Sequence, residues 1–335
     1  MKIIFFGLEK KDQEVFKNAF SGAEVSFYEE KLDENNAALA KDADAISVFV
    51  NCTVNKSIID AMPNLKFIST RSTGYDHIDC EYAATKGIKV SNVPAYGSHT
   101  VAEYAFGLIL NLSRNIIKAN NYIRKSLDFN YDSGMEGFDL VGKTLGIIGT
   151  GKIGKNVAKI AKAFEMNVLA YDLFPDMSFA KENNFLYKSL LEVLEQADII
   201  TLHTPYNKEN HHLINKENIA KMKKGVYLIN TARGELVDTE ALIWGLKEGI
   251  IAGLGSDLLE EERILKDEKN LLRSGKLKET EMRIIDLNHE LMKMPNVIIT
   301  PHIAFFTREA VASIFQTTVE NIQGFISGKP INLVK

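Results

Sequence analysis

A glycine-rich turn between an apolar run and an amphipathic helical pattern constrains the fold of this chain more than any other feature. The segment Gly149-Thr150-Gly151-Lys152-Ile153-Gly154 directly follows the apolar run 144–148. The first glycine permits a tight turn, the second lets a pyrophosphate approach the backbone, and the third lets the helix pack closely on the strand. The pattern predicts a strand–turn–helix unit of a parallel sheet that binds a dinucleotide at the helix N-terminus.

A carboxylate at a suitable distance supports this interpretation. Asp172 ends the next apolar run, 18 residues after Gly154 (172 − 154), close to the roughly 20 residues typical of an acidic ribose ligand. Such a carboxylate accepts from both ribose hydroxyls and repels a 2′-phosphate, which favours NAD over NADP. Alternatively, Asp172 only forms the turn at the strand end. We expect NAD to contact Gly149, Gly151, Lys152, Ile153, Gly154 and Asp172.

Short β-branched and aromatic runs alternate with helical patterns along the chain, which is typical of βαβ units. A first series occupies residues 3–6, 45–50, 66–70 and 88–91, and a second occupies 144–148, 167–171, 198–203, 226–230, 251–255 and 297–300. We therefore predict an α/β fold with two doubly wound parallel-sheet domains. The six strands of the second series match a dinucleotide-binding sheet.

Two helical patterns mark the boundary between these domains. One helix is predicted at 98–117, and a last helix is predicted at 308–326, after the second sheet is complete. We infer that the last helix folds back onto the first domain, giving a discontinuous domain of 1–98 plus 302–335 and a central domain of 99–301. The charged stretch 260–295 is interpreted as a solvated helical excursion or, alternatively, as a rim over the active site or a subunit contact.

Composition excludes several classes of protein. In 335 residues, 40 Lys and Arg against 44 Asp and Glu offer no basic field for nucleic acid or an anionic membrane. No apolar run approaches the ~20 residues that span a bilayer, and the apolar start Met1 to Phe6 is too short for a signal peptide. Two cysteines are too few for a disulfide framework. We expect a cytoplasmic protein without nucleic-acid or membrane partners.

The histidines outside the motifs do not predict a metal site. His211 and His212 are adjacent, so we expect their side chains to point apart, and no nearby residue completes a metal-ligand spacing. No metal is predicted.

Four segments resemble the D-isomer-specific 2-hydroxyacid dehydrogenase family, in the right order along nearly the whole chain. They are 71–79 (RSTGYDHID), 197–205 (ADIITLHTP), 223–238 (KKGVYLINTARGELVD) and 300–302 (TPH). The resemblance implies a Rossmann NAD-binding domain and a smaller flavodoxin-like substrate domain made of both chain ends. It also implies a homodimer.

The resemblance further implies the catalytic residues Arg233, Glu262 and His302. The planar fork of Arg233 can hold a carboxylate and a carbonyl together. His302 would protonate the alkoxide in reduction and accept the hydroxyl proton in oxidation. Glu262 lies at the family's spacing, five residues after Asp257 (262 − 257), and would hydrogen-bond His302. Glu260 is the alternative for this role.

The same resemblance implies further contacts around the reacting atoms. Expected substrate contacts are Gly74, Tyr75, Tyr96, Phe305, Arg233 and His302. Expected cofactor contacts beyond the glycine turn are Thr204 and Pro205 near the adenosine, and Thr231, Ala232 and Asp257 near the nicotinamide. His203, in the same segment as Thr204, is a further expected cofactor contact, with a structural role as the alternative. A position in the protein core is the competing interpretation of Tyr96.

These features predict an NAD-dependent enzyme that interconverts a 2-oxoacid and a D-2-hydroxyacid by hydride transfer. Segments 91–96 and 301–307 resemble the D-lactate branch of the family, which implies pyruvate and D-lactate. One alternative is another enzyme of the family, such as a glyoxylate or hydroxypyruvate reductase or a 3-phosphoglycerate dehydrogenase. The other is a non-enzymatic NAD-sensing adaptor.

Overall fold

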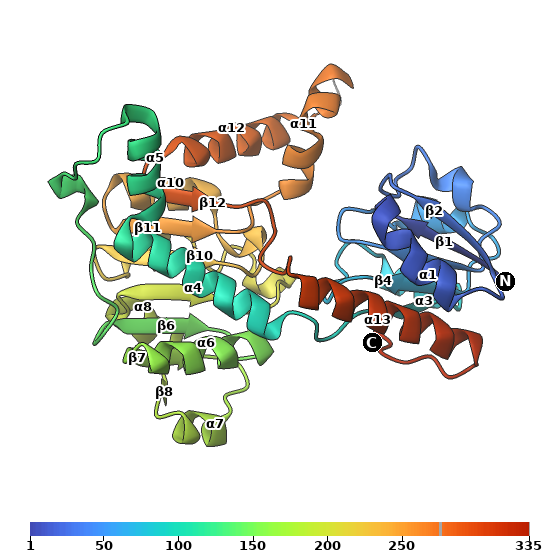
Figure 1. Ribbon diagram of the computed structural model, residues 1–335, viewed down its shortest axis with the longest axis horizontal. Helices are drawn as coiled ribbons and strands as arrows, with labels where there is room; N and C mark the ends of the chain where they lie inside the picture. The colour runs from blue at the N-terminus through green and yellow to red at the C-terminus, as the bar shows by residue number, and fades with distance from the viewer. Residues whose placement is uncertain (275–276, 335) are drawn as a thin grey trace. The chain divides into compact units, whose positions relative to one another are not determined.

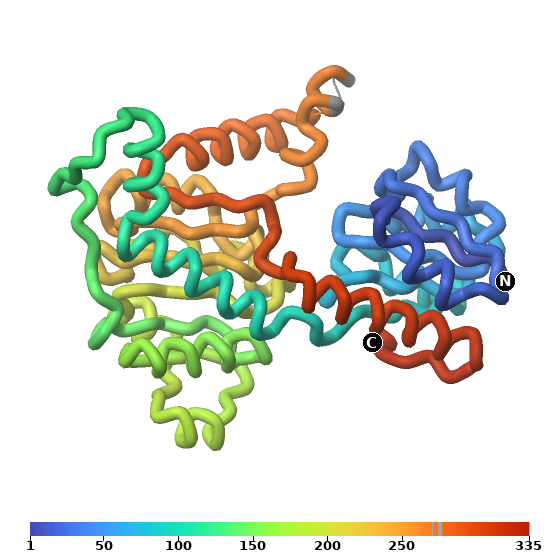
Figure 2. The backbone as a smooth tube through the Cα atoms, in the orientation of Figure 1, coloured from blue at the N-terminus to red at the C-terminus, as the bar shows by residue number. Residues whose placement is uncertain are grey.

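The computed structural model describes residues 1–274 and 277–334. The chain forms two compact units, one of residues 1–96 with the segment from 306 onward, and one of residues 97–305. Figure 2 follows the chain from the first unit into the second and back. Every helix in the described ranges is too short or too polar to span a bilayer.

The first unit contains a five-stranded parallel sheet in the order β2-β1-β3-β4-β5. Along β1, Ile3 and Phe5 point to one face and Ile4 and Phe6 to the other, as the pleat of a strand requires. Helices α1 and α13 cover the first face, and α2 and α3 cover the second. The bounds are β1 (Lys2–Phe6), β2 (Glu24–Tyr28), β3 (Ala45–Val48), β4 (Phe67–Thr70), β5 (Lys89–Ser91), α1 (Gln13–Ala19), α2 (Lys56–Asp60), α3 (Cys80–Thr85) and α13 (Arg308–Ile326).

Four strands are predicted in this unit and the structure has five. The additional strand, β2, pairs with β1 at the edge of the sheet, and none of its residues is fully buried. A half-exposed edge strand needs fewer apolar residues than a buried one, here Val25, Phe27 and Tyr28. It therefore lacks the continuous apolar run that identifies the buried strands.

The second unit contains a seven-stranded parallel sheet in the order β12-β11-β10-β9-β6-β7-β8. The strands are β6 (Thr144–Ile148), β7 (Asn167–Tyr171), β8 (Leu186–Tyr187), β9 (Ile199–Leu202), β10 (Val226–Asn230), β11 (Ile251–Ser256) and β12 (Val297–Ile299). Six strands are predicted here. The seventh, β8, has two residues at the sheet edge, which is too short to produce a period-2 pattern.

Helices cover both faces of this sheet. Along β10, Leu228 and Ile229 point into opposite apolar clusters. Helices α4 (Ser98–Arg114) and α6 (Lys152–Ala163) cover one face, and Figure 1 shows them in front of the sheet. The other face is covered by α8 (Leu190–Gln196), α9 (Lys216–Ala220), α10 (Thr239–Lys247) and α12 (Glu279–Lys293).

The predicted helix 98–117 is divided in the structure. Helix α4 ends at Arg114, and Asn115 adopts a left-handed φ of 52°, which asparagine tolerates better than most residues. A separate helix, α5 (Ile116–Ser126), follows. The remaining helices are α7 (Met177–Glu182), α11 (Glu262–Ser274) and the 3₁₀ helices η1 (Lys10–Asp12), η2 (Ala37–Ala40), η3 (Ser133–Met135), η4 (Lys208–Asn210) and η5 (Gly234–Leu236).

The charged stretch 260–295 is more than a solvated excursion. It contains α11 and α12, and α12 buries Ile285, Asn288 and Leu291 on the side that contacts α10. Leu291 belongs to the apolar cluster beneath the sheet. This helix is therefore part of the core of the second unit.

Candidate active site

The glycine turn has the geometry that each glycine's role requires. Gly149 has a φ of +95°, and a Cβ there would lie 2.6 Å from the backbone nitrogen of Thr204. A Cβ on Gly154 would lie 2.0 Å from the carbonyl oxygen of Gly149, so α6 packs directly on the turn. At Gly151 no described atom would lie within 4 Å of a Cβ. Open space therefore adjoins the N-terminus of α6, where backbone N–H groups attract a phosphate.

Asp172 follows β7 and points toward this turn. Its Oδ2 accepts from the Thr150 N–H (2.5 Å) and hydroxyl (2.9 Å), and its Oδ1 accepts from the Phe174 N–H (2.8 Å). Burial acts to raise the pKa of Asp172, but the hydrogen bonds from Phe174 and Thr150 outweigh it, so the pKa lies below its ordinary value. The carboxylate is therefore ionised at neutral pH, as ribose binding and repulsion of a 2′-phosphate require. The ribose contact itself stays a prediction.

The strand order reverses between β6 and β9, and a doubly wound sheet binds its ligand at the carboxyl ends of the strands at such a point. His203, Thr204 and Pro205 follow β9 and lie there. His203 is 8% exposed, and its Nε2 lies 2.8 Å from the Thr201 hydroxyl. Burial lowers the pKa of His203 to about 3, so its ring is neutral. The predicted adenosine contacts of this segment stay predictions.

The segment after β10 carries Arg233. The buried Asn230 side chain accepts from the Ala232 N–H (3.0 Å) and donates to the Arg233 carbonyl (2.8 Å), which fixes the turn. The half-buried guanidinium of Arg233 donates to the Ala232 carbonyl (2.7 Å). The Thr231 hydroxyl is buried and has no hydrogen-bond partner among the described residues. This orphaned group, together with the open turn at Gly151, fits the binding of a nicotinamide dinucleotide along this edge.

His302 follows β12, at the same edge as Arg233, because β10, β11 and β12 are parallel neighbours. Its φ of +58° is left-handed, which costs a non-glycine residue about 1–2 kcal/mol. The His302 N–H donates to the carbonyls of Asp257 (2.9 Å) and Thr300 (3.0 Å), which hold it there. Its ring Nδ1 lies 2.8 Å from Oε1 of Glu262, the first residue of α11.

The structure separates the two candidates for the histidine's carboxylate partner. Glu262 is paired with His302, whereas Glu260 is turned toward His212, 2.8 Å from its Nε2. Burial acts to raise the pKa of Glu262, but the hydrogen bond and charge of His302, with a smaller effect of Lys266, lower it overall. The Glu262 carboxylate is therefore ionised at neutral pH.

Asp257 positions His302, a role that the sequence pattern did not reveal. It is 1% exposed, and its carboxylate accepts from the Thr300 hydroxyl (2.6 Å) and the N–H groups of Ile303 (2.9 Å) and Ala304 (2.8 Å). These bonds clamp the chain on both sides of His302. Burial raises the pKa of Asp257 despite them. The position of Asp257 at the end of a buried strand could have indicated a structural role. Its hydrogen-bond partners could not be predicted, because they follow β12 and come close only when β11 and β12 pair. Its predicted nicotinamide contact stays a prediction.

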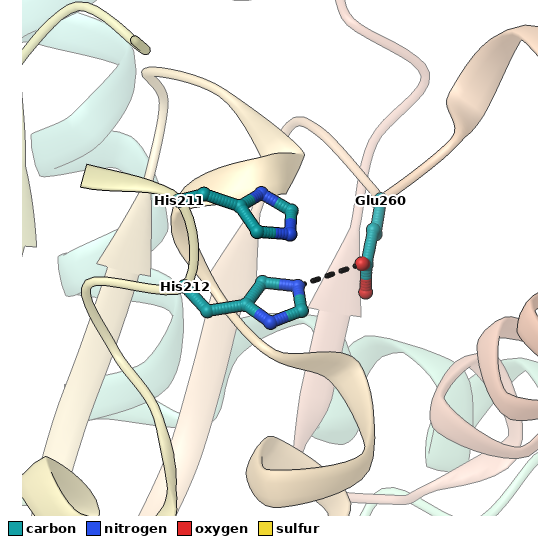
Figure 3. Close-up of side chains that lie close together, drawn as sticks. All are labelled: His211, His212 and Glu260. Carbon is teal, nitrogen blue, oxygen red and sulfur yellow. Dashed lines mark hydrogen bonds and ion pairs between the residues drawn. The ribbon is translucent and has the colours of Figure 1, made fainter. Parts of the chain in front are cut away.

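The prediction that His211 and His212 point apart is wrong. Their rings stack, with centroids 3.8 Å apart and 23° between planes. Consecutive side chains point apart in an extended strand, but His212 has a left-handed φ of 53°, which turns the chain. Glu260 lies beside both rings, so a group of three potential metal ligands exists where no metal-ligand spacing is predicted (Figure 3).

The predicted substrate contacts divide between the two units. Gly74 and Tyr75 lie between β4 and α3, and Tyr96 lies between β5 and α4; all three belong to the first unit. Tyr75 is 40% exposed. Phe305 belongs to the second unit, and its ring meets that of His302 edge-on, with centroids 6.5 Å apart.

The carboxyl edge of the seven-stranded sheet thus combines a dinucleotide turn with a guanidinium and an imidazole–carboxylate pair. Arg233 and His302 lie after β10 and β12, and the glycine turn lies after β6, two strands from β10. A guanidinium can orient an anionic substrate, and the imidazole can move a proton.

Comparisons with known proteins agree with this chemistry. Residues 106–304 match the family model described as D-isomer specific 2-hydroxyacid dehydrogenase, NAD binding domain. A 2-hydroxyacid dehydrogenase homolog from Zymomonas mobilis is 38% identical over 98% of both chains. An aromatic 2-oxoacid reductase from Clostridium sporogenes is 40% identical over 97% of this chain and 96% of its own.

A solved structure is similar along the whole length as well. The D-lactate dehydrogenase of Aquifex aeolicus, complexed with NAD and lactic acid, is 39% identical and superposes with a TM-score of 0.89, covering 98% of this chain and 96% of its own. The chain therefore belongs to the D-isomer specific 2-hydroxyacid dehydrogenase family and is an NAD-dependent D-2-hydroxyacid dehydrogenase.

Proposed function

We propose that this enzyme reduces a small 2-oxoacid to the D-2-hydroxyacid with NADH, and that pyruvate and D-lactate are the pair that it converts. The His302–Glu262 pair, 2.8 Å apart, carries the proposal. Reduction of a carbonyl to an alcohol needs a group that supplies a proton to the oxygen, and this imidazole lies at the edge where the cofactor turn opens. The similar A. aeolicus enzyme was solved with lactic acid.

His302 is the proposed proton donor. Its Nδ1 is engaged by Glu262, which fixes the tautomer and leaves Nε2 for the substrate oxygen. The Glu262 carboxylate also orients the ring, because its Oε1 lies 2.8 Å from Nδ1. Asp257 holds the backbone on both sides of the ring. In the oxidative direction the same Nε2 would accept the hydroxyl proton.

Arg233 is the proposed substrate anchor. Its fork can donate to the 2-oxoacid carboxylate and to the carbonyl oxygen, which polarises the carbonyl as negative charge develops. Bound NADH supplies the hydride. We propose Gly74, Tyr75 and Tyr96, in a substrate domain of residues 1–98 plus 302–335, and Phe305 as further residues that contact the substrate.

Aromatic 2-oxoacids are the second candidate substrates. The C. sporogenes relative is an aromatic 2-oxoacid reductase at 40% identity, and the proposed substrate contacts Tyr75, Tyr96 and Phe305 are themselves aromatic. Ring-to-ring contacts would stabilise a phenyl side chain by about 0.5–1.5 kcal/mol beyond burial, so the two substrate classes differ by an effect that kinetics can measure.

A kinetic panel tests the proposal. Rates with pyruvate, phenylpyruvate, 4-methyl-2-oxopentanoate, glyoxylate, hydroxypyruvate and 3-phosphohydroxypyruvate are measured with NADH and with NADPH, and the product is assayed with enantiomer-specific enzymes. We expect the highest kcat/KM with pyruvate and NADH, and D-lactate as product. A highest kcat/KM with phenylpyruvate would assign the aromatic class. An L-product would contradict the proposed positions of Arg233 and His302.

We also propose a cytoplasmic homodimer. Leu127, Phe129 and Tyr131 follow α5 and are 88%, 92% and 90% exposed, and exposure of several large apolar side chains within one short segment supports an interaction site there. Sedimentation velocity should give twice the mass of one chain. A monomer at micromolar concentration would contradict the dimer without affecting the proposed reaction.

A further inference from the structure

A cluster of three side chains outside the proposed active site has the arrangement of a metal site. His211 and His212 follow η4, and Glu260 lies between β11 and α11. One potential ligand atom of each residue lies within 4.8 Å of the other two. Figure 3 shows both rings with a nitrogen turned toward the Glu260 carboxylate.

In both imidazoles the nitrogen that faces away from the cluster has a polar side chain near it. The Tyr206 hydroxyl lies 3.4 Å from Nδ1 of His211, which leaves Nε2 for the cluster. A carboxylate oxygen of Asp238 lies 4.0 Å from Nδ1 of His212, whose Nε2 faces Glu260. A carboxylate behind the far nitrogen of a histidine is the usual outer partner of a metal ligand, because it orients the ring and makes the other nitrogen more basic.

The Glu260 carboxylate is buried and lacks a permanent cation. The residue is 9% exposed, and its Oε2 accepts from the Thr239 hydroxyl (2.7 Å) and N–H (3.3 Å). Within the described part of the chain no lysine or arginine forms an ion pair with it, and its Oε1 lies 2.8 Å from Nε2 of His212. A buried carboxylate needs a compensating charge, and a divalent ion would supply it.

The donor set selects the class of metal. Two imidazoles and one carboxylate suit Zn²⁺, Co²⁺ or Ni²⁺, whereas Mg²⁺ and Ca²⁺ prefer oxygen ligands throughout. A tetrahedral zinc ion with bonds of about 2.0–2.2 Å separates its ligand atoms by about 3.4 Å. Because His211 is exposed, rotation of its side chain can bring the wider separations in the cluster to that value.

We propose that His211, His212 and Glu260 bind one Zn²⁺ or similar transition-metal ion, with a fourth position for water. The ion would tie the segment after β9 to the segment after β11. A Cβ on Gly234 would lie 2.5 Å from the backbone nitrogen of Glu260, so the turn that carries Arg233 packs on the same segment. A bound ion would therefore stabilise the backbone that supports the proposed active site.

Zinc binding to the full-length, chelator-treated protein tests the proposal. Zn²⁺ is titrated against a competing colorimetric chelator, and Co²⁺ is titrated while the visible d–d absorption is recorded. The variants are His211→Gln, which changes an exposed side chain, and His212→Gln. Two controls carry the same change at other histidine–glutamate pairs: His289→Gln, whose ring lies 3.1 Å from Glu268, and His302→Gln.

We expect one Zn²⁺ per chain, with binding at least tenfold weaker in His211→Gln and His212→Gln and unchanged in His289→Gln and His302→Gln. Zn²⁺ should raise the melting temperature of the wild type more than that of His211→Gln. Equal affinity of His211→Gln and wild type, loss of binding only in His302→Gln, or no binding by the wild type would each overturn the site. None of these readouts depends on turnover, so failure here leaves the proposed reaction untouched.

Discussion

Two imidazole–carboxylate pairs of equal length lie in the second unit, and their carboxylates are two residues apart in sequence. Glu262 pairs with Nδ1 of His302 at 2.8 Å, and Glu260 pairs with Nε2 of His212 at 2.8 Å. Between the two glutamates, Glu261 has a left-handed φ of 54°, which turns the chain. One carboxylate is therefore directed to the cofactor edge of the sheet and the other to the segment after β9.

The two pairs have the same N–O distance, but their surroundings differ. Glu260 has its second oxygen bonded to Thr239 and is 9% exposed, so it is built into the protein core. The Glu262 side chain is 22% exposed, against 10% for the Glu260 side chain, whereas the His302 ring (18%) is less exposed than the His212 ring (30%). The comparison teaches that two pairs with the same N–O distance differ in how firmly the core holds the carboxylate, because Glu260 is bonded through both oxygens and is the less exposed of the two.

The largest expected difference between the pairs is in turnover. His302→Gln should lower kcat for pyruvate reduction by roughly 10²–10⁴-fold, because it removes the proposed proton donor. NADH binding, followed by the fluorescence of the bound cofactor, should persist. His289→Gln, at a third histidine–glutamate pair, is the control and should keep wild-type kcat. If His302→Gln kept the wild-type kcat, His302 would not be the proton donor, and the two pairs would not differ in their part in catalysis.

The free energy of unfolding should depend more on the Glu260 pair than on the Glu262 pair. Glu260→Ala leaves the Thr239 hydroxyl and N–H without their buried acceptor, which should cost about 1–3 kcal/mol in the free energy of unfolding. Glu262→Ala should cost less, because its carboxylate is more exposed. Urea unfolding followed through Trp244, the single tryptophan, reports on α10, which begins at Thr239. Equal losses in both variants would show that the two pairs play the same structural part.

His203, which has no carboxylate partner among the described residues, should make the stability of the protein depend on pH. His203 is neutral in the folded protein because burial lowers its pKa to about 3, whereas an unfolded histidine titrates near ~6.5. The unfolded chain binds more protons between these values, so this contribution to stability is full above about pH 6.5 and is lost as the pH falls toward 3. The expected slope is up to about 1.4 kcal/mol per pH unit.

His203→Gln should remove that part of the pH dependence. The free energy of unfolding of wild type and variant is compared at pH 7.0, 6.0 and 5.0 by urea unfolding, and the difference between them should shrink as the pH falls. A difference that stays constant with pH would mean that the folded protein accommodates the protonated ring.

The smallest expected effect is a changed acid limb of the pH–rate profile. Glu262 keeps its charge at neutral pH, because its interaction with His302 lowers the pKa of Glu262 against the effect of burial. The carboxylate is therefore charged above this lowered pKa and loses its charge, and its hold on the His302 ring, only as the pH falls through it. Glu262→Gln has no charge to lose, so the part of the acid limb of kcat that comes from Glu262 should disappear. Glu260→Gln should keep the wild-type profile, and loss of the acid limb in that variant instead would transfer the role to Glu260.

Local sequence patterns were sufficient to predict those parts of the fold and site that are formed by residues close together in the chain. The turn at 149–154 is read from six consecutive residues, and the structure shows the close contacts that require Gly149 and Gly154. The strands at 144–148, 167–171 and 226–230 have the predicted bounds. The edge strands β2 and β8 were missed because partly exposed or very short strands carry no continuous apolar run.

Local patterns could not decide which glutamate pairs with His302. Glu260, Glu261 and Glu262 are identical and consecutive, so spacing alone left Glu260 as an alternative for the partner of His302. A left-handed residue between them decides their directions, and its conformation depends on contacts distant in sequence. The stacking of His211 on His212 depends in the same way on the left-handed backbone of His212.

By itself the sequence determined the parallel α/β architecture, the dinucleotide turn and the residue types needed to move a hydride and a proton, because apolar periodicity and glycine spacing act over a few residues. Only the tertiary structure decided which glutamate meets which histidine and gave Asp257 its clamp on the chain around His302. These choices follow from strand pairing and backbone turns that bring together residues 40 or more positions apart.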